Sequence, residues 1–236
     1  MAHDLGPKDE LSKFLDQATK KGVDTPGAVP DRYARLVEID DAFMLVQQNL
    51  NYSDRWFVGL MFLRSHSAFR AAVRLALSGQ LPEAYAIMRG AIENAMYGLH
   101  FDRNYSSIDT WLQRNNDPQT LKKAKDAFKY HTVKSTLSAV DKRTSELASR
   151  LYDLAIDQGG HPNQRSLMGS LRIIESTEKT EVKVAYLSGD RLGIEVCLKS
   201  VAETGICCLQ IFGNAFEKRF AILGIPQLLA GIVRRL

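Results

Sequence analysis

The sequence predicts an all-α protein, a single-domain up-and-down helical bundle with at most one small β-hairpin. Apolar residues recur at steps of three and four along most of the chain, which is the spacing of one helical face. Proline and glycine signals separate several of these periodic segments by short connections. The hydrophobic fraction of 45% over 236 residues supplies an ordinary core, and no linker interrupts the chain after residue 30. We therefore expect one bundle domain over residues 31–236.

The first 30 residues are expected to form a polar arm and linker. A weak helix is followed by the run Thr25-Pro26-Gly27-Ala28-Val29-Pro30, in which the prolines favour extended backbone.

Three long helices are predicted next. In residues 31–50 the apolar positions Leu36, Ile39 and Phe43 lie on one helical face. Ser53 and Asp54 offer capping oxygens, and residues 56–77 then continue without a helix breaker. Gly79 suits a helix end and Pro82 a helix start, so the third helix covers residues 82–102.

The rest of the chain repeats these signals. Asp117-Pro118 starts a basic helix over 121–134, and Gly159-Gly160 ends a longer helix over 138–157. Alternating apolar residues predict a hairpin that pairs 171–175 with 180–187 across 176–179. The remaining predicted helices are 109–114, 190–220 and 226–235.

Composition restricts the location and partners of the protein. Thirty-one basic against 27 acidic residues give a net charge of +4, which permits a nucleic-acid partner without requiring one. The three cysteines, Cys197, Cys207 and Cys208, lack zinc-ligand spacing and are expected to be reduced. Residues 1–10 have no apolar run, and the near-apolar segment 220–233 is shorter than the ~20 residues that span a bilayer. We expect a cytoplasmic protein with no membrane crossing.

The helix over 82–102 carries the most informative polar residues. It is apolar or small around most of its circumference, yet Arg89, Glu93 and His100 fall within about 40° of one another on its face. One interpretation is a structural Arg89–Glu93 ion pair, in which Arg89→Ala would cost about 3–5 kcal/mol by leaving Glu93 unpaired in a dry environment. In the other, Arg89 binds a phosphate or carboxylate while Glu93 orients it or accepts a proton.

A second candidate residue, His161, lies between Gly159-Gly160 and Pro162-Asn163. A histidine constrained at a helix end is suited to proton transfer or to hydrogen bonding with an anion. It could equally cap the preceding helix by bonding a carbonyl.

Arg89-Gly90-Ala91-Ile92-Glu93, followed by a helix with Tyr152 that leads into His161-Pro162-Asn163, resembles uncharacterised prokaryotic families of the HEPN-like superfamily over roughly residues 55–215. The resemblance implies an up-and-down helical bundle, often a homodimer, and in some members a metal-independent RNase of toxin or phage-defence systems. In those nucleases four to six residues separate an arginine from a histidine on one helix. None of the five histidines here has that spacing, since the nearest arginine before His161 is Arg150.

Lysines between residues 120 and 135 form the best candidate nucleic-acid contact, the alternative being an ordinary solvated helix face. They are interleaved with Phe128 and Tyr130, and the set is Lys122, Lys123, Lys125, Lys129 and Lys134.

No Glu-x-x-His pair or phosphate-binding loop occurs, so neither a metal nor a cofactor is expected.

The sequence therefore predicts an RNA- or nucleotide-directed HEPN-like module. In it, Arg89, Glu93 and His161 would be the catalytic residues, if the protein has chemistry, and Lys122, Lys123, Lys125 and Lys129 would bind nucleic acid. A non-enzymatic homodimeric interaction protein with a structural Arg/Glu/His line, or a small-anion or metal-binding bundle, are the alternatives.

Overall fold

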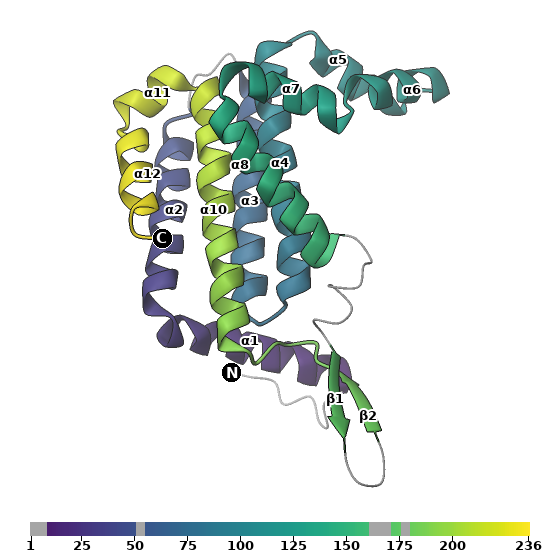
Figure 1. Cartoon of the computed structure of the whole chain (residues 1–236). Coiled ribbons are helices and arrows are strands. Elements are labelled where there is room, and N and C mark those ends of the chain that lie inside the picture. Colours follow the sequence, from purple (N-terminus) through teal and green to yellow (C-terminus); the bar gives the residue numbers. More distant parts are fainter. Residues whose placement is uncertain (1–8, 51–54, 161–170, 176–179) are drawn as a thin grey trace.

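The structure is a computed structural model that describes residues 9–50, 55–160, 171–175 and 180–236 (Figure 1). It confirms the all-α bundle. It also contains one small antiparallel hairpin, in which β1 (Leu171–Glu175) pairs with β2 (Thr180–Val184) and Leu171 lies opposite Val184.

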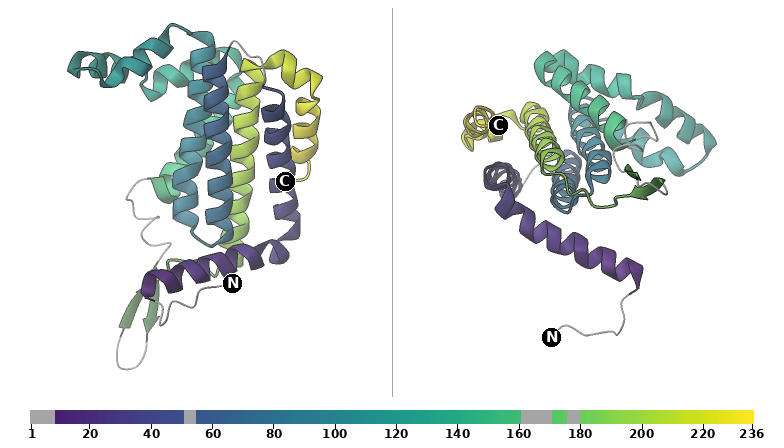
Figure 2. Two further views of the ribbon diagram at one scale, coloured as in Figure 1. Left: turned by 180° about the vertical axis from the view of Figure 1, so that it is seen from behind. Right: turned by 60° about the horizontal axis from the view of Figure 1, so that its bottom comes forward.

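Long helices run side by side and enclose one hydrophobic core (Figures 1 and 2). They are α2 (Pro30–Gln48), α3 (Trp56–Leu77), α4 (Leu81–Arg103), α8 (Lys142–Ala155) and α10 (Arg191–Ala215). Phenylalanines from four of them fill the centre, namely Phe43, Phe62, Phe69, Phe101 and Phe212. Arg89 and Glu93 thus lie on a helix that is packed on most of its sides.

The predicted extended linker at residues 25–30 is wrong. Helix α1 (Glu10–Ala28) continues through Pro26, and α2 begins two residues after α1 ends. Proline is tolerated there because it removes only one amide donor near the end of the helix. The Val29 amide still donates to the Thr25 carbonyl at 3.1 Å. Helix α1 crosses one end of the bundle (Figure 2).

The predicted basic helix over 121–134 is divided in two by the structure. Helix α6 (Pro118–Ala127) ends before Phe128, and α7 (Tyr130–Val140) begins after the extended residue Lys129. Helix α5 (Ser107–Leu112), the 3₁₀ turn η1 (Gln113–Asn115) and α6 extend from the bundle as an arm (Figures 1 and 2). The chain breaks there because the Phe128 ring packs against Tyr97 and Phe101 of α4.

Two further predicted helices are also shorter than expected. The segment 138–157 contains a boundary at Asp141, whose carboxylate accepts from the Thr144 amide at 3.0 Å and so starts α8. Helix α8 passes into the π-helical turn η2 (Ile156–Gly160). The last predicted long helix divides at Phe216 into α10 and α11 (Glu217–Ile222), and α12 (Ile225–Val233) follows.

Candidate functional site

Arg89 and Glu93 form an ion pair on α4 that is completed by a residue of α8. The Arg89 Nε donates to Glu93 Oε1 at 2.9 Å, and the Tyr152 hydroxyl donates to the same oxygen at 3.0 Å. The Arg89 guanidinium also lies 5.3 Å from the centre of the Tyr152 ring. The hydrogen bond that Arg89 donates to Glu93 raises the pKa of Arg89, so the guanidinium stays charged. Arg89 is thereby oriented toward its own helix and α8 rather than presented as a free anion receptor.

Tyrosine side chains surround the Glu93 carboxylate. Tyr130 of α7 stacks on Tyr152 with ring centres 4.3 Å apart, and Tyr97 donates its hydroxyl hydrogen to the Phe128 carbonyl at 3.1 Å. Burial, together with the charge of Glu93, raises the pKa of Tyr152 to about 12. The pKa of Tyr97 is raised for the same two reasons, and that of Tyr130 is raised by burial and by the charges of Asp153 and Glu93. All three phenols therefore remain protonated at neutral pH and can donate hydrogen bonds.

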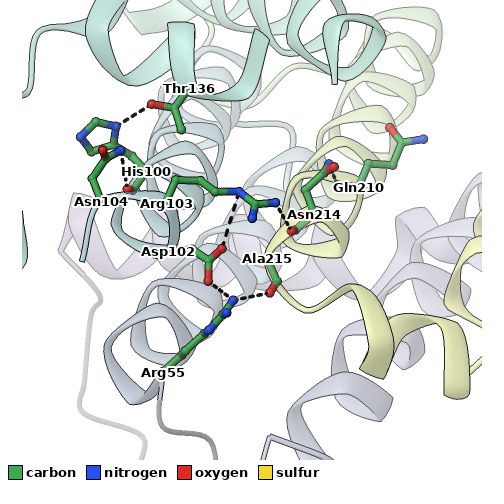
Figure 3. A network of polar contacts seen from close by, with 9 residues as sticks. All are labelled: Arg55, His100, Asp102, Arg103, Asn104, Thr136, Gln210, Asn214 and Ala215. Atoms are coloured by element: carbon green, nitrogen blue, oxygen red, sulfur yellow. Dashed lines mark hydrogen bonds and ion pairs between the residues drawn. The ribbon is translucent and has the colours of Figure 1, made fainter. Parts of the chain in front are cut away.

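The predicted catalytic set is only partly tested by this geometry. Arg89 and Glu93 are brought together, whereas His161 lies outside the described residues. His100 does not join the pair, because its Nδ1 lies 2.8 Å from the Thr136 hydroxyl of α7 (Figure 3). It is also seven residues, or about 10 Å of helix, beyond Glu93. The predicted line of three ionisable groups is therefore two separate contacts.

Arg89→Ala is expected to lower the free energy of unfolding by about 1–2 kcal/mol, less than the value expected for a dry site. The side chains of Arg89 and Glu93 are 32% and 37% exposed, so water replaces part of the lost pairing, and the remaining loss includes the contact with Tyr152. Urea unfolding of the variant and of the wild type measures the difference. A loss above about 3 kcal/mol would restore the interpretation of a dry pair.

A buried carboxylate fastens the base of the arm to the bundle. The Asp102 side chain is 1% exposed and forms ion pairs with Arg55 and Arg103 (Figure 3). Arg55 also donates to the Ala215 carbonyl at 3.0 Å, and Arg103 donates to the Asn214 carbonyl at 3.0 Å. Burial raises the pKa of Asp102, against the effect of the two guanidinium groups. The contacts join the C-terminal ends of α4 and α10 just before the arm begins.

The lysines of α6 are exposed to solvent. Its first turn is fixed by a capping box between Asp117 and Thr120. Leu121 and Ala124 lie on the inner side of the helix, whereas the four predicted nucleic-acid contacts, Lys122, Lys123, Lys125 and Lys129, are exposed. Among the described residues, Lys129 is the only one of the four with an ion pair, at 2.9 Å from Asp126.

Aromatic side chains accompany the lysines on the arm. Tyr105, just before α5, is more than half exposed, and the Arg114 guanidinium lies 5.4 Å from the centre of the Trp111 ring. The exposed ring of Tyr105 gives a nucleic-acid base a surface for stacking. The Trp111 ring, by contrast, packs edge-on against Phe57 and Phe101 of the core. Sequence reasoning did not single out Tyr105, Trp111 or Arg114. Their position just before the basic segment is the signal that could have found them.

The described part of the chain offers little support for a metal site or for a reactive cysteine. No group of three His, Cys, Asp or Glu side chains that could hold a metal ion occurs among the described residues. Burial raises the pKa of Cys197 and of Cys208 to about 12 and holds that of Cys207 well above its usual value, so these thiols stay protonated.

A buried histidine joins α2 to α3. His66 Nε2 lies 2.6 Å from Asp40 Oδ1, and Arg70 holds both oxygens of the same carboxylate at 2.7 and 2.8 Å. The His66 ring stacks on Phe43 at 4.7 Å. Burial lowers the pKa of His66 despite the neighbouring carboxylate, and burial also lowers the pKa of His100.

The stability of the protein is expected to fall as the pH drops below about 6.5. The folded state favours the neutral forms of His66 and His100. Their contribution to the free energy of unfolding is therefore complete above the pKa of an unfolded histidine, and it is lost as the pH falls through and below that value. Thermal unfolding between pH 7 and pH 5 measures this effect. The double variant His66→Gln/His100→Gln should show a flatter dependence, and an unchanged slope would contradict the assignment.

Comparison with protein-family models, with curated proteins and with solved structures finds no match for this chain. In the described residues, no helix combines the length and the apolar character that a membrane crossing requires. Function must therefore be argued from the geometry alone.

Proposed function

We propose that the protein binds single-stranded RNA through the α5–α6 arm, and that the Arg89–Glu93 pair has a structural role in this binding module. The observation that carries the proposal is the exposure of Lys122, Lys123 and Lys125 on the projecting helix α6, with the exposed Lys129 just after it. Phosphate backbones are bound chiefly by such cations, since each contact releases condensed counterions.

The arm is suited to a single strand because it combines charge with an exposed aromatic ring. Tyr105 lies just before α5, so a base can stack on it while phosphates contact the cations. The fixed base of the arm at Asp102 supports this role, because it holds the segment in one place before RNA arrives.

The contacts of Arg89 favour a protein that binds RNA over one that cleaves RNA. Its Nε is engaged by Glu93 and its guanidinium packs on Tyr152, so phosphate would have to compete with a carboxylate that is already in place. RNA cleavage that depends on His161, binding of a nucleotide, pairing with a second copy of the chain and a role in toxin or phage-defence systems stay predictions.

Charge reversal on the arm tests the proposal. The triple variant Lys122→Glu/Lys123→Glu/Lys125→Glu should weaken binding of a fluorescent oligouridylate by at least about tenfold, because it removes phosphate contacts and adds repulsion. Fluorescence anisotropy at fixed salt measures the dissociation constant. The matched control Lys20→Glu/Lys142→Glu/Lys218→Glu changes the same net charge at exposed positions of α1, α8 and α11.

The two triple variants give opposite expectations. The control should bind RNA within about threefold of the wild type, since long-range effects of net charge are screened by salt. Equal weakening of both would show that net charge alone attracts RNA. Unchanged binding of the arm variant would show that RNA contacts another surface, and either result would defeat the proposal.

A further inference from the structure

The first residues of α3 lie at the base of the arm. Arg55, just before the helix, forms an ion pair with Asp102 at the end of α4 (Figure 3). Phe57 packs edge-on against Trp111 of α5, with the ring centres 5.7 Å apart. Trp56 stands between these two anchored residues in the chain, so its place at the base of the arm is fixed from both sides.

Trp56 nevertheless presents its ring to solvent. The residue is 58% exposed, although its ring meets the Phe57 ring edge-on at 5.4 Å. An indole has a large apolar area, and leaving it uncovered forgoes the free energy of burial. A flat ring that is held in place and open to solvent is the kind of surface on which nucleic-acid bases stack.

Two other groups at the base of the arm complement this ring. Tyr105, two residues after the end of α4, is also more than half exposed. Arg114 of η1 is exposed, lies over the Trp111 ring, and forms no ion pair with any residue that the structure describes. Trp56 and Tyr105 thus provide two rings for bases, and Arg114 provides a cation for a phosphate.

The lysine-bearing side of the arm returns to the same end of the bundle. Phe128, which follows α6, packs against Phe101 of α4 with the ring centres 5.6 Å apart. Phe101 in turn meets Phe57 edge-on at 5.2 Å. A strand that passes Lys129 toward the bundle therefore reaches the helix ends between which Trp56 lies.

We propose that Trp56 is a base-stacking residue of the RNA site, so that a single strand bound by the lysines of the arm continues onto the start of α3. This role rests on the proposed function, because stacking on one ring is too weak to hold RNA without the phosphate contacts of the arm. Every base has a flat face, so Trp56 would add affinity without selecting a sequence.

A second copy of the chain is the other occupant to consider for this side of α3. Trp56, Leu60 and Leu63 recur at steps of four and three, and all three are partly exposed. Three such side chains on two turns of helix offer far less than the roughly 800 Å² per partner that a stable protein interface buries. Arg64, exposed and without an ion pair in the described ranges, adjoins them and favours an anionic partner.

Tryptophan fluorescence tests stacking directly. Trp56 and Trp111 are the two tryptophans of the chain, so the emission of the variant Trp111→Phe comes from Trp56 alone. Saturating oligouridylate should quench most of this emission. The same variant carrying Lys122→Glu/Lys123→Glu/Lys125→Glu should keep its emission at the same RNA concentration, which controls for quenching by free RNA. Unchanged emission of Trp111→Phe with RNA bound would overturn the proposal.

Binding measurements test the contribution of the ring. Trp56→Ala should weaken oligouridylate binding at least about fivefold, whereas Trp56→Phe retains a ring and should lose less. The slope of affinity against salt should stay that of the wild type, because it reports phosphate contacts. The matched control Tyr186→Ala removes an exposed ring before α10, whose opposite end meets the base of the arm, and should bind RNA like the wild type.

The outcomes separate stacking on Trp56 from RNA binding by the arm. If charge reversal on the arm weakens binding while Trp56→Ala does not, the arm binds RNA and the role of Trp56 is wrong. Absence of RNA binding by the wild type would overturn both. Sedimentation tests the other occupant: if Trp56→Ala converts a dimer into a monomer and leaves RNA affinity unchanged, this side of α3 binds a second copy and the proposal is wrong.

Discussion

Phe212→Ala is expected to lower the free energy of unfolding by about 3–5 kcal/mol, the largest effect of any substitution considered for this protein. Phe212 is fully buried in the middle of the core. Its ring contacts Phe62 edge-on at 5.1 Å and covers the backbone of α4 at Gly98. Truncation removes these contacts and leaves a cavity between α3, α4 and α10, which rigid helices fill only in part.

Urea unfolding at pH 7 measures the loss. The control Phe212→Leu keeps part of the volume and should lose less than the alanine variant. A loss below about 1 kcal/mol for Phe212→Ala would mean that the helices collapse into the space, contrary to the packing described here.

The second large effect is expected for Gly159→Ala in the turn η2. A Cβ atom added at Gly159 would lie 1.9 Å from the carbonyl oxygen of Pro82, in the first turn of α4. Backbone atoms cannot move aside as a flexible side chain can, so η2 must separate from α4. We expect a loss of about 3 kcal/mol, at the upper end of the usual cost of overpacking.

Gly90→Ala is the matched control on α4. A Cβ at Gly90 meets nothing within 4 Å, and the position is helical, so alanine should stabilise the protein by about 0.5–1 kcal/mol. Thermal or urea unfolding of the two variants measures both changes. If Gly159→Ala unfolds like the wild type, the close approach of η2 to α4 is incorrect.

Helix boundaries with a local chemical cause were predictable from the sequence. The predicted helix over 56–77 agrees with α3 at both ends, although its N-cap Arg55 forms no side-chain capping bond. The predicted caps Ser53 and Asp54 lie outside the described residues. The start of α4 follows the Gly79 and Pro82 signals. Gly79 has a φ of 84°, a left-handed value that glycine adopts without strain. The hairpin was also predictable, because alternating residues in two adjacent segments need only a short connection.

Boundaries set by tertiary contacts were not predictable. Nothing local ends α6 at Phe128, where the ring packs on Tyr97 and the carbonyl accepts the hydroxyl hydrogen of Tyr97, 31 residues earlier. The Asp141 cap of α8, by contrast, was visible in the sequence and was missed inside an apparently continuous helix.

In the candidate site, too, contacts within one helix were predictable and contacts between helices were not. Spacing alone predicted the Arg89–Glu93 pair, because residues four apart share a helical face. Tyr152, by contrast, approaches Glu93 from α8, 59 residues later in the chain. Periodicity within one segment carries no information about such contacts between segments.

The salt dependence of RNA affinity measures directly whether lysines of the α5–α6 arm contact the phosphates of RNA. The dissociation constant of a fluorescent oligouridylate is measured between about 50 and 200 mM NaCl. Three to four lysine contacts predict that the logarithm of affinity falls with the logarithm of salt at a slope of about −2 to −3, and the arm variant should lose most of that slope. No measurable binding at the lowest salt, or a slope shared by the wild type and the arm variant, would contradict the proposal that the arm binds RNA.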